Sequence, residues 1–330
     1  ICFAMKFKIS RSIFFKTLSH LQGIVDKKNS LPILANILIE AKDNHLILSS
    51  TDMDISIIEK IGCEVFEDGA TTINSQILYD IVRKIDDNSE IEIISNNGKL
   101  LTLRSEGSRF SLACLPKEDF PIIEKDNSGA DIILNSKILF KLIDKTKFAI
   151  SNEETRYFLN GLYFNVTNED GKNIVTLVGT DGHRLAKFSH EINEKIDQVS
   201  GVIIPKKTIY ELSKLLSEFD NGVNISISSN KIVFIIGDII FISKLIDGSF
   251  PDYKRVIPND NKNILKINRD KLLSAVDRVS TIANEKSPVI KFKLFQNVLN
   301  LNTINTESST ASEDLDISYE GDEIEIGFNS

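Results

Sequence analysis

The chain repeats its own pattern at a spacing of about 130 residues, and this repeat constrains the fold more than any other feature. In three places a short strand-like run leads into a polar residue and then into a basic amphipathic helix, and these runs are 7–9, 132–134 and 265–267. The polar residues are Ser10, Asn135 and Asn268, which are 125 and 133 residues apart. Ser and Asn favour the position before a helix, because their side-chain oxygens accept hydrogen bonds from the free N–H groups of the first turn. The pattern predicts a protein built from copies of one structural unit.

Further landmarks keep the same spacing and the same order. The Thr-Asp pairs at 51–52 and 180–181 are 129 residues apart, and the Phe-Pro pairs at 120–121 and 250–251 are 130 residues apart. One echo could arise by chance. Several echoes in one order indicate an internal repeat.

Strand-like runs gather between isolated helices in each full unit. A strand leads into a first helix, two or three strands follow, and a second helix precedes another group of strands. The expected strands of the first unit include 36–41, 45–49, 90–95, 99–104 and 109–114, and the second helices are expected near 75–85 and 206–218. Grouped, alternating strands predict an α+β fold with antiparallel sheets, and not a doubly wound parallel sheet.

The repeat divides the 330 residues into three predicted domains. They are expected at 5–127, 128–258 and 259–330. The third contains one expected helix, at 269–281, and four strand-like runs that end at 324–328. Since this is about half of a full unit, the third domain is expected to be incomplete at its C-terminus.

The overall composition excludes several classes of protein. Hydrophobic residues make up 42% and charged residues 26%, which is ordinary for a globular protein. No apolar run approaches the roughly 20 residues of a membrane span. Met5 is interpreted as the natural start, and the N-terminus lacks the pattern of a signal peptide. Cys2, Cys63 and Cys114 are unclustered, which argues against a disulfide framework and a zinc site. We therefore expect a reduced, cytoplasmic protein without a metal or other cofactor.

The net charge of −8 opposes nucleic-acid binding at first sight, because Lys and Arg must neutralise phosphates. The distribution of charge changes this interpretation. The helical segments 11–25, 75–85, 136–147, 206–218 and 269–281 contain 14 Lys and Arg against 6 Asp and Glu, whereas the remainder contains 25 against 41. Either the helices carry ordinary solvating lysines, or they line one surface that faces a polyanion while the strands form an acidic exterior. The second arrangement suits sequence-independent binding and sliding on DNA.

The run Thr-Asp-Gly-His-Arg-Leu at 180–185 is the most conspicuous motif. Its Asp, His and Arg side chains could perform acid–base chemistry. No phosphate-binding loop, nucleophile elbow or paired-histidine metal motif accompanies them. Asp-Gly is also a turn signal, so turn formation alone can explain the run.

Two other segments have both a structural and a functional interpretation. The segment 250–258 contains two prolines, which predict an extended domain connector that could also line a groove for a partner peptide. Tyr157 and Phe158 are expected at the start of a strand, where aromatic side chains usually belong to the core. If they are exposed, they could contact DNA.

Several motifs together resemble the bacterial sliding clamp, the beta subunit of DNA polymerase III. They are Thr-Asp-Gly-His-Arg-Leu-Ala at 180–186, Phe-Pro-Asp-Tyr with Arg-Val at 250–256, Arg-Tyr-Phe-Leu-Asn-Gly at 156–161, Arg-Phe-Ser-Leu with Leu-Pro at 109–116, Leu-Pro-Ile-Leu at 31–34 and Glu-Ile-Gly-Phe-Asn at 325–329. The resemblance implies a non-catalytic processivity factor without cofactors. Its three-domain protomers would form a head-to-tail homodimeric ring with helices inside and sheets outside. The implied partners are double-stranded DNA, bound without sequence preference, the catalytic subunit of the replicative polymerase, the clamp loader, and repair and translesion polymerases.

The resemblance also implies roles for individual residues. The partner-peptide groove, between the second and third domains, would be formed by Leu159, Thr180, Gly182, His183, Arg184, Leu185, Pro251, Arg255 and Val256. The DNA-facing residues would be Lys28, Arg83, Tyr157, Phe158, Lys206 and Lys207. The subunit interface would pair Phe110 and Leu112 of one protomer with Thr281 and Ile282 of the next.

The chain departs from the family pattern in three places. Position 158 is Phe where Tyr is common, and position 281 is Thr where a larger apolar residue is expected. The smaller Thr281 would weaken apolar burial at the interface by about 1 kcal/mol. The family's C-terminal tail, which supplies further groove residues and strands, does not follow Ser330. A chain that ended there is expected not to close a sound ring.

Two other functions stay open from the sequence. A hydrolase that uses Asp181, His183 and Arg184 would show turnover that is lost on His183→Ala. An interaction module built from repeats, with no role on DNA, would need the positive charge of the helices to be scattered instead of gathered on one face.

Overall fold

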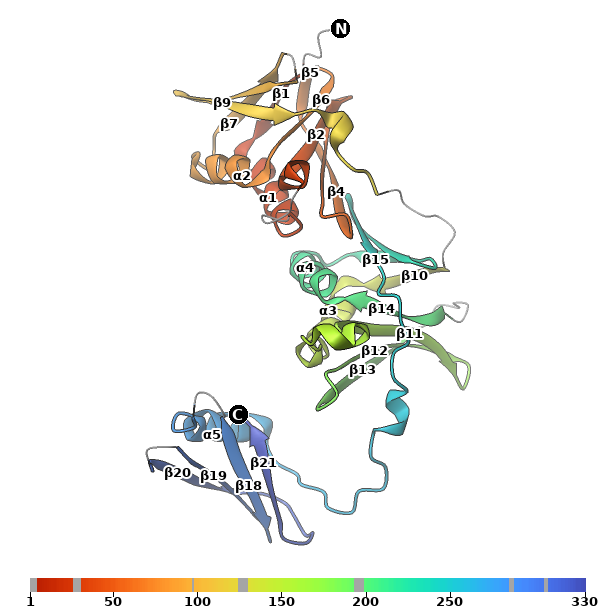
Figure 1. Ribbon diagram of the computed structural model, residues 1–330, viewed down its shortest axis with the longest axis vertical. Helices are drawn as coiled ribbons and strands as arrows, with labels where there is room; N and C mark the ends of the chain where they lie inside the picture. Colours follow the sequence, from red (N-terminus) through yellow and green to blue (C-terminus); the bar gives the residue numbers. More distant parts are fainter. Residues whose placement is uncertain are drawn as a thin grey trace. The chain divides into compact units, whose positions relative to one another are not determined.

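The structure is a computed structural model and describes residues 5–25, 31–96, 98–123, 130–192, 199–284, 288–305 and 308–330. The chain separates into two compact units, Ile1–Phe250 and Pro251–Ser330, which are described one at a time (Figure 1). No helix within the described ranges is long and apolar enough to cross a membrane.

The first unit begins with one complete copy of the repeat. Its helices and strands are β1 (Met5–Ser10), α1 (Arg11–Gln22), β2 (Asn36–Lys42), β3 (His45–Thr51), β4 (Ile55–Gly62), β5 (Glu64–Glu67), β6 (Gly69–Asn74), α2 (Ser75–Lys84), β7 (Glu90–Ser95), β8 (Leu100–Ser105) and β9 (Ser108–Leu115).

A second complete copy follows within the same unit. It consists of β10 (Ala130–Asn135), α3 (Ser136–Asp144), β11 (Gly161–Glu169), β12 (Lys172–Thr180), β13 (Leu185–Ile192), β14 (Val199–Pro205), α4 (Lys206–Leu216), β15 (Gly222–Ile227), β16 (Lys231–Ile236) and β17 (Ile239–Lys244). Short 3-10 turns occupy Lys147–Ala149 and Glu154–Leu159 between α3 and β11.

The second unit contains one helix and four strands in its described part. They are α5 (Arg269–Ser280), β18 (Val289–Phe295), β19 (Val298–Ile304), β20 (Thr310–Asp316) and β21 (Ile324–Asn329). The helix packs on β18, β19 and β20, and the core of this unit includes Ala275, Val279, Leu299, Leu301 and Tyr319.

The polar residues that define the repeat are helix caps, as the sequence predicts. The Ser10 side chain accepts a hydrogen bond from a first-turn N–H of α1 at 3.5 Å. Asn135 does the same for α3 at 2.9 Å, and Asn268 caps α5 by accepting from two N–H groups at 3.0 and 3.1 Å. Each bond satisfies a donor that the helix itself cannot pair.

Strand order confirms that the repeat is structural. The order β4-β3-β2-β6 in the first copy is matched by β13-β12-β11-β14 in the second copy and by β20-β19-β18-β21 in the second unit. Every strand pairing is antiparallel, for example Tyr163↔Val178 in the second copy. The predicted α+β fold with antiparallel sheets and repeated domains is therefore confirmed.

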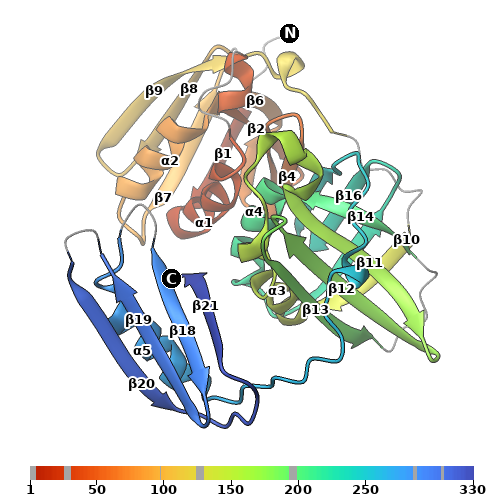
Figure 2. The ribbon, with the colours of Figure 1, turned by 60° about the horizontal axis from the view of Figure 1, so that its bottom comes forward.

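The helices of the first unit pack in pairs against the strands. In the ribbon, α1 lies beside α2 and α3 lies beside α4 (Figures 1 and 2). In α1 the buried residues Phe14, Leu18 and Leu21 recur at a spacing of four and three, which places them on one face toward the sheet. Each such side chain stabilises the fold by roughly 1.5–3 kcal/mol through burial.

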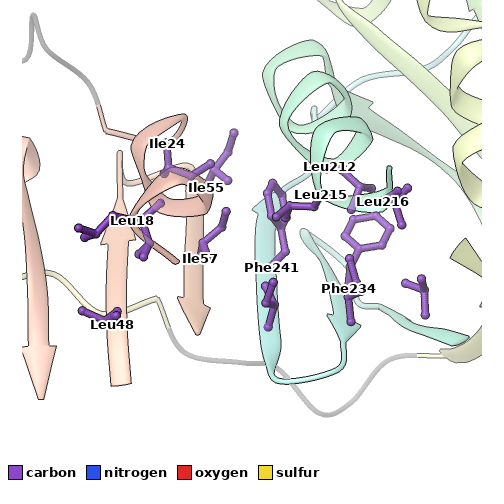
Figure 3. Packing of buried hydrophobic residues seen from close by; sticks show 14 of the residues in the cluster. Leu18, Ile24, Leu48, Ile55, Ile57, Leu212, Leu215, Leu216, Phe234 and Phe241 are labelled. Atoms are coloured by element: carbon purple, nitrogen blue, oxygen red, sulfur yellow. The ribbon is translucent and has the colours of Figure 1, made fainter. Parts of the chain in front are cut away.

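A single sheet crosses from the first copy into the second. β17 pairs with β4, with Phe241 opposite Ile57, and this pairing joins the strands of the first copy to β10, β15, β16 and β17 of the second in one sheet of 13 strands. Figure 3 shows Ile55 and Ile57 on one side of the junction and Phe241 on the other. The two copies therefore share a continuous hydrophobic core.

Three local predictions differ from the structure. The segment 265–267 is no strand and makes only an isolated bridge between Lys266 and Ser318, because the described part of this unit offers no counterpart of β7 to pair with it. The connector at 250–258 is not fully extended, since Tyr253–Arg255 forms a 3-10 turn with Tyr253 buried. Tyr157 and Phe158 lie in a 3-10 turn before β11 and not in a strand.

Candidate peptide and DNA sites

The conspicuous run at 180–185 forms the turn between β12 and β13, and this turn has a defined shape. The Thr180 hydroxyl donates a hydrogen bond to the carbonyl of Arg184 at 2.7 Å and accepts one from the N–H of Gly182 at 3.1 Å. The Asp181 carboxylate accepts from the N–H groups of His183 and Arg184 at 2.9 and 3.0 Å. The side chains of Thr180 and Asp181 thus fold the backbone around themselves.

The matching turn of the first copy, at 51–55, has the same hydrogen bonds. The Thr51 hydroxyl donates to the carbonyl of Ile55 at 2.8 Å and accepts from the N–H of Met53 at 3.1 Å. The Asp52 carboxylate accepts from Asp54 and Ile55 at 3.0 and 2.7 Å. Met53 has φ +79°, close to the +87° of Gly182. The repeated Thr-Asp pair is therefore a repeated turn.

The two turns differ in what covers them. In the 51–55 turn, Lys207 contacts Asp52 at 2.5 Å and Lys244 contacts Asp54 at 3.0 Å, and both lysines come from the second copy. In the 180–185 turn, His183 is exposed and the side chain of Arg184 is 58% exposed. The acidic side chains of the first turn are paired with lysines of the second copy, whereas the outer side chains of the second turn, His183 and Arg184, stay exposed.

A second arginine supports the 180–185 turn from behind. Arg156 lies so close that a Cβ atom at position 182 would be 2.4 Å from its Nη1 atom. Glu153 holds the same guanidinium through two hydrogen bonds, from Nε at 2.8 Å and from Nη2 at 2.6 Å. The hydrogen bond to Arg156 holds the pKa of Glu153 below its ordinary value, and the same bond raises the pKa of Arg156. Sequence reasoning missed both residues, although their spacing of three is the spacing at which oppositely charged side chains meet in a helical turn.

The electrostatics of Asp181 argue against a catalytic role. Partial burial opposes ionisation of its carboxyl, but hydrogen bonds from the backbone of His183 and Arg184 outweigh burial, so its pKa lies below the ordinary value. The carboxylate also accepts from Nε of Arg184 at 3.0 Å. A carboxylate that is this strongly held is a poor general base at neutral pH. Its hydrogen bonds form the turn.

The remaining predicted groove residues divide between the two units. Leu159 is buried at the end of the 3-10 turn Glu154–Leu159, and Leu185 is half-buried at the start of β13. Pro251, Arg255 and Val256 belong to the second unit and are exposed. Val256 keeps 67% of its surface exposed.

The predicted DNA-facing residues have different environments. Tyr157 is 55% exposed and meets Phe158 edge to face, with ring centroids 5.8 Å apart. Arg83, in the last turn of α2, pairs with Asp80 at 3.3 Å and stays largely exposed.

Of the predicted lysines, Lys206 and Lys207 are the first two residues of α4. Lys206 contacts the Asn152 side chain, and Lys207 donates to the carbonyl of Ile24 at 2.9 Å as well as to Asp52. Lys207 therefore makes contacts within the chain, while 42% of its side chain stays exposed. Lys28 lies outside the described residues.

The predicted interface residues lie on separate elements. Phe110 and Leu112 are half-buried on β9. Thr281 is the C-cap of α5 and is exposed, and Ile282 follows it and is half-buried.

Other chemistry is not evident in the described parts of the chain. No group of three or more His, Cys, Asp or Glu side chains is arranged there to hold a metal ion. Cys63 and Cys114 are free thiols, and burial raises the pKa of Cys63 to about 11 and that of Cys114 in the same direction. A thiol with a raised pKa is a poor nucleophile.

Comparisons with known proteins give matches along the whole chain. Family profiles for the N-terminal, central and C-terminal domains of the DNA polymerase III beta subunit match residues 5–124, 133–252 and 254–330. A beta sliding clamp of Caulobacter vibrioides (strain NA1000 / CB15N) is 41% identical over 327 residues, which cover 99% of this chain and 88% of that protein. The beta sliding clamp of Escherichia coli (strain K12) is 36% identical over 326 residues, covering 98% and 87%. A crystal structure of a sliding clamp from Bartonella birtlesii bound to griselimycin has a TM-score of 0.95 and 42% identity, covering 99% and 87%.

Proposed function

The chain belongs to the bacterial sliding clamps, the beta subunits of DNA polymerase III, and we propose that the exposed 180–185 turn is part of its groove for partner peptides. A sliding clamp is a non-catalytic processivity factor that encircles duplex DNA and tethers polymerase to it. The hydrolase interpretation of Asp181, His183 and Arg184 is therefore wrong.

The contrast between the two Thr-Asp turns carries this proposal. Both turns have the same backbone shape, but only in the 51–55 turn do lysines of the other copy pair with the acidic side chains. The 180–185 turn keeps its fixed shape while Arg184 and His183 stay exposed. A turn of fixed shape with exposed outer side chains, and with the half-buried Leu185 at its end, suits a short, largely apolar peptide.

The proposed groove residues are those that the family resemblance implies. Its members are Leu159, Thr180, Gly182, His183, Arg184, Leu185, Pro251, Arg255 and Val256. Proposed occupants are peptide segments of the replicative polymerase, the clamp loader, and repair and translesion polymerases. Because they would share one site, they would compete for it.

Griselimycin is proposed as a probe of this groove. Sliding clamps from Bartonella birtlesii and Pseudomonas aeruginosa have been crystallised bound to it. We expect labelled griselimycin to bind this protein, and Val256→Glu to weaken binding at least about tenfold because a charge would replace an apolar contact.

A matched control distinguishes an effect at the groove from a general effect of adding a negative charge to the second unit. Ile264 is 61% exposed, close to the exposure of Val256, and lies outside the proposed groove. Ile264→Glu should leave griselimycin binding unchanged. Equal affinity of both variants would overturn the assignment of Val256 to the groove.

The proposed DNA-facing surface consists of basic and aromatic residues. They are Lys28, Arg83, Tyr157, Phe158, Lys206 and Lys207. The excess of Lys and Arg in the helical segments supports attraction of the phosphate backbone without sequence preference. The protein is proposed to act in the cytoplasm on chromosomal DNA.

Internal repetition supports the proposed subunit interface. β17 of the second copy pairs with β4 of the first. Within the repeat, β9 is the counterpart of β17, and β20 is the counterpart of β4. Pairing of β9 with β20 of a second protomer would therefore reuse a known contact. β9 carries the expected interface residues Phe110 and Leu112, and Thr281 and Ile282 lie at the C-terminal end of α5, which packs on β20. A homodimeric ring is typical of the family.

Retention on DNA tests the clamp function as a whole. The protein loaded on a nicked circular plasmid should stay bound during gel filtration and should be released once the plasmid is made linear. Topological trapping explains this result, because electrostatic contacts alone would not distinguish a circle from a line. Equal retention on circular and linear DNA would contradict encirclement.

A further inference from the structure

The 180–185 turn must keep its shape if it is to serve as one wall of a groove. Its internal hydrogen bonds shape the backbone, but a turn at the end of two strands also needs support from a neighbouring element. In the first copy that support comes from Lys207 and Lys244 of the second copy. The 180–185 turn receives support from residues of its own copy.

That support is the guanidinium of Arg156. A Cβ atom at position 182 would lie 2.4 Å from its Nη1 atom, which means that the guanidinium fills the space that a side chain would need. Leu31 occupies the place of Arg156 in the first copy, 125 residues earlier, so this support is specific to the second copy.

The orientation of Arg156 is fixed by Glu153. The carboxylate accepts from Nε at 2.8 Å and from Nη2 at 2.6 Å, which leaves Nη1 directed at Gly182. Two parallel hydrogen bonds between a guanidinium and a carboxylate fix the plane of the guanidinium as well as its position. Nε and Nη2 are thus held by Glu153, and Nη1 contacts the turn.

The Glu153 residue is itself held firmly in place. Its N–H donates to the Ser151 hydroxyl at 3.1 Å, and its carbonyl accepts from the Asn160 side chain at 3.1 Å. Asn160 directly follows the groove residue Leu159. The acid therefore belongs to a well-defined loop and not to a freely moving surface chain.

We propose that Glu153 is a positioning residue for the peptide groove, which orients Arg156 against Gly182 and so fixes the 180–185 turn. This inference rests on the proposed function of the turn. Glu153 acts through Arg156 and need not touch the bound peptide.

The test compares Glu153→Gln with the neighbouring Glu154→Gln. Both substitutions remove one negative charge, but Glu154 makes no ion pair in the described part of the chain. Glu153→Gln should weaken binding of labelled griselimycin by about tenfold, since it removes a charge-assisted pair. Glu154→Gln should change binding less than about twofold, and Glu153→Asp should restore part of the affinity because it keeps the charge.

The backbone amide resonance of Gly182 gives a readout that needs no ligand. It should shift in Glu153→Gln and stay in place in Glu154→Gln. An unshifted Gly182 resonance, or full affinity in Glu153→Gln, would overturn the positioning role. Failure of the unaltered protein to bind griselimycin, with the Gly182 shift present, would overturn the proposed groove and leave the positioning of the turn intact.

Discussion

Two independent features favour glycine at position 182: the backbone conformation and the lack of room for a side chain. Its φ of +87° lies in the left-handed region, and Arg156 fills the volume of a side chain. Gly182→Ala should therefore lower the free energy of unfolding by about 1–2 kcal/mol through the backbone, with a further loss from the displaced Arg156. Chemical denaturation measures the total.

Gly237 provides the control for the backbone effect alone. It has φ +58°, but a Cβ atom there would meet nothing within 4 Å. Gly237→Ala should therefore destabilise the protein less than Gly182→Ala. Equal losses would show that the contact with Arg156 has no energetic weight.

His20 links the two copies of the repeat through a buried cluster of charges. Its Nδ1 atom is 2.8 Å from Glu59 and its Nε2 atom 3.2 Å from Glu218, and Thr17 also donates to Glu59 at 3.1 Å. Burial lowers the pKa of His20, but the two carboxylates outweigh burial, so its pKa is raised.

A raised pKa makes stability depend on pH with a definite sign. The folded protein binds the His20 proton more tightly than the unfolded chain, whose histidines titrate near about pH 6.5. The stabilisation is complete below that pH and is lost as pH rises through the raised pKa. The free energy of unfolding should therefore fall as pH increases above about 6.5, and His20→Gln should reduce this fall. His45→Gln, at an exposed histidine, should keep it; an unchanged pH slope in His20→Gln would refute the link.

At the scale of whole elements, each predicted helix cap can be tested by replacing the capping residue with one that has no side-chain acceptor. Asn268 accepts two hydrogen bonds at the start of α5, the helix of the second unit's described core. Asn268→Ala should lower the stability of that unit by about 1 kcal/mol. Asn268→Asp retains an acceptor and should restore most of it; a thermal melt of each variant gives the comparison.

Elements with a strong local signal could be predicted from the sequence, and those that depend on distant partners could not. The predicted helix at 75–85 is Ser75–Lys84 in the structure, because a cap and an apolar stripe define it locally. The run 265–267 has the alternation of a strand but has no ladder, since a strand needs a neighbour. The Thr-Asp turn was visible in the sequence, but its support by Arg156 depends on how the loop before β11 folds.

At the scale of the whole molecule, the sheet that joins the two copies was not predictable from alternation. The sequence of β4 indicates a strand, but it does not show which strand pairs with its outer edge, because edge pairing uses backbone groups. Only the structure shows β17 on that edge, with Phe241 opposite Ile57.

The charge distribution leads to a prediction that distinguishes electrostatic attraction to DNA from topological retention of a closed ring. Arg83 lies on a helix and is proposed to face DNA, whereas Lys60 lies exposed on strand β4. Arg83→Glu and Lys60→Glu change the net charge equally. If the helices attract phosphates, Arg83→Glu should weaken binding to linear DNA and reduce the salt dependence of that binding by about one unit of slope, and Lys60→Glu should not.

Retention on nicked circles should be the same for both variants, because a closed ring is held by topology and not by any one phosphate contact. Faster escape of Arg83→Glu from circles would show that direct contacts, and not encirclement, hold the protein on DNA.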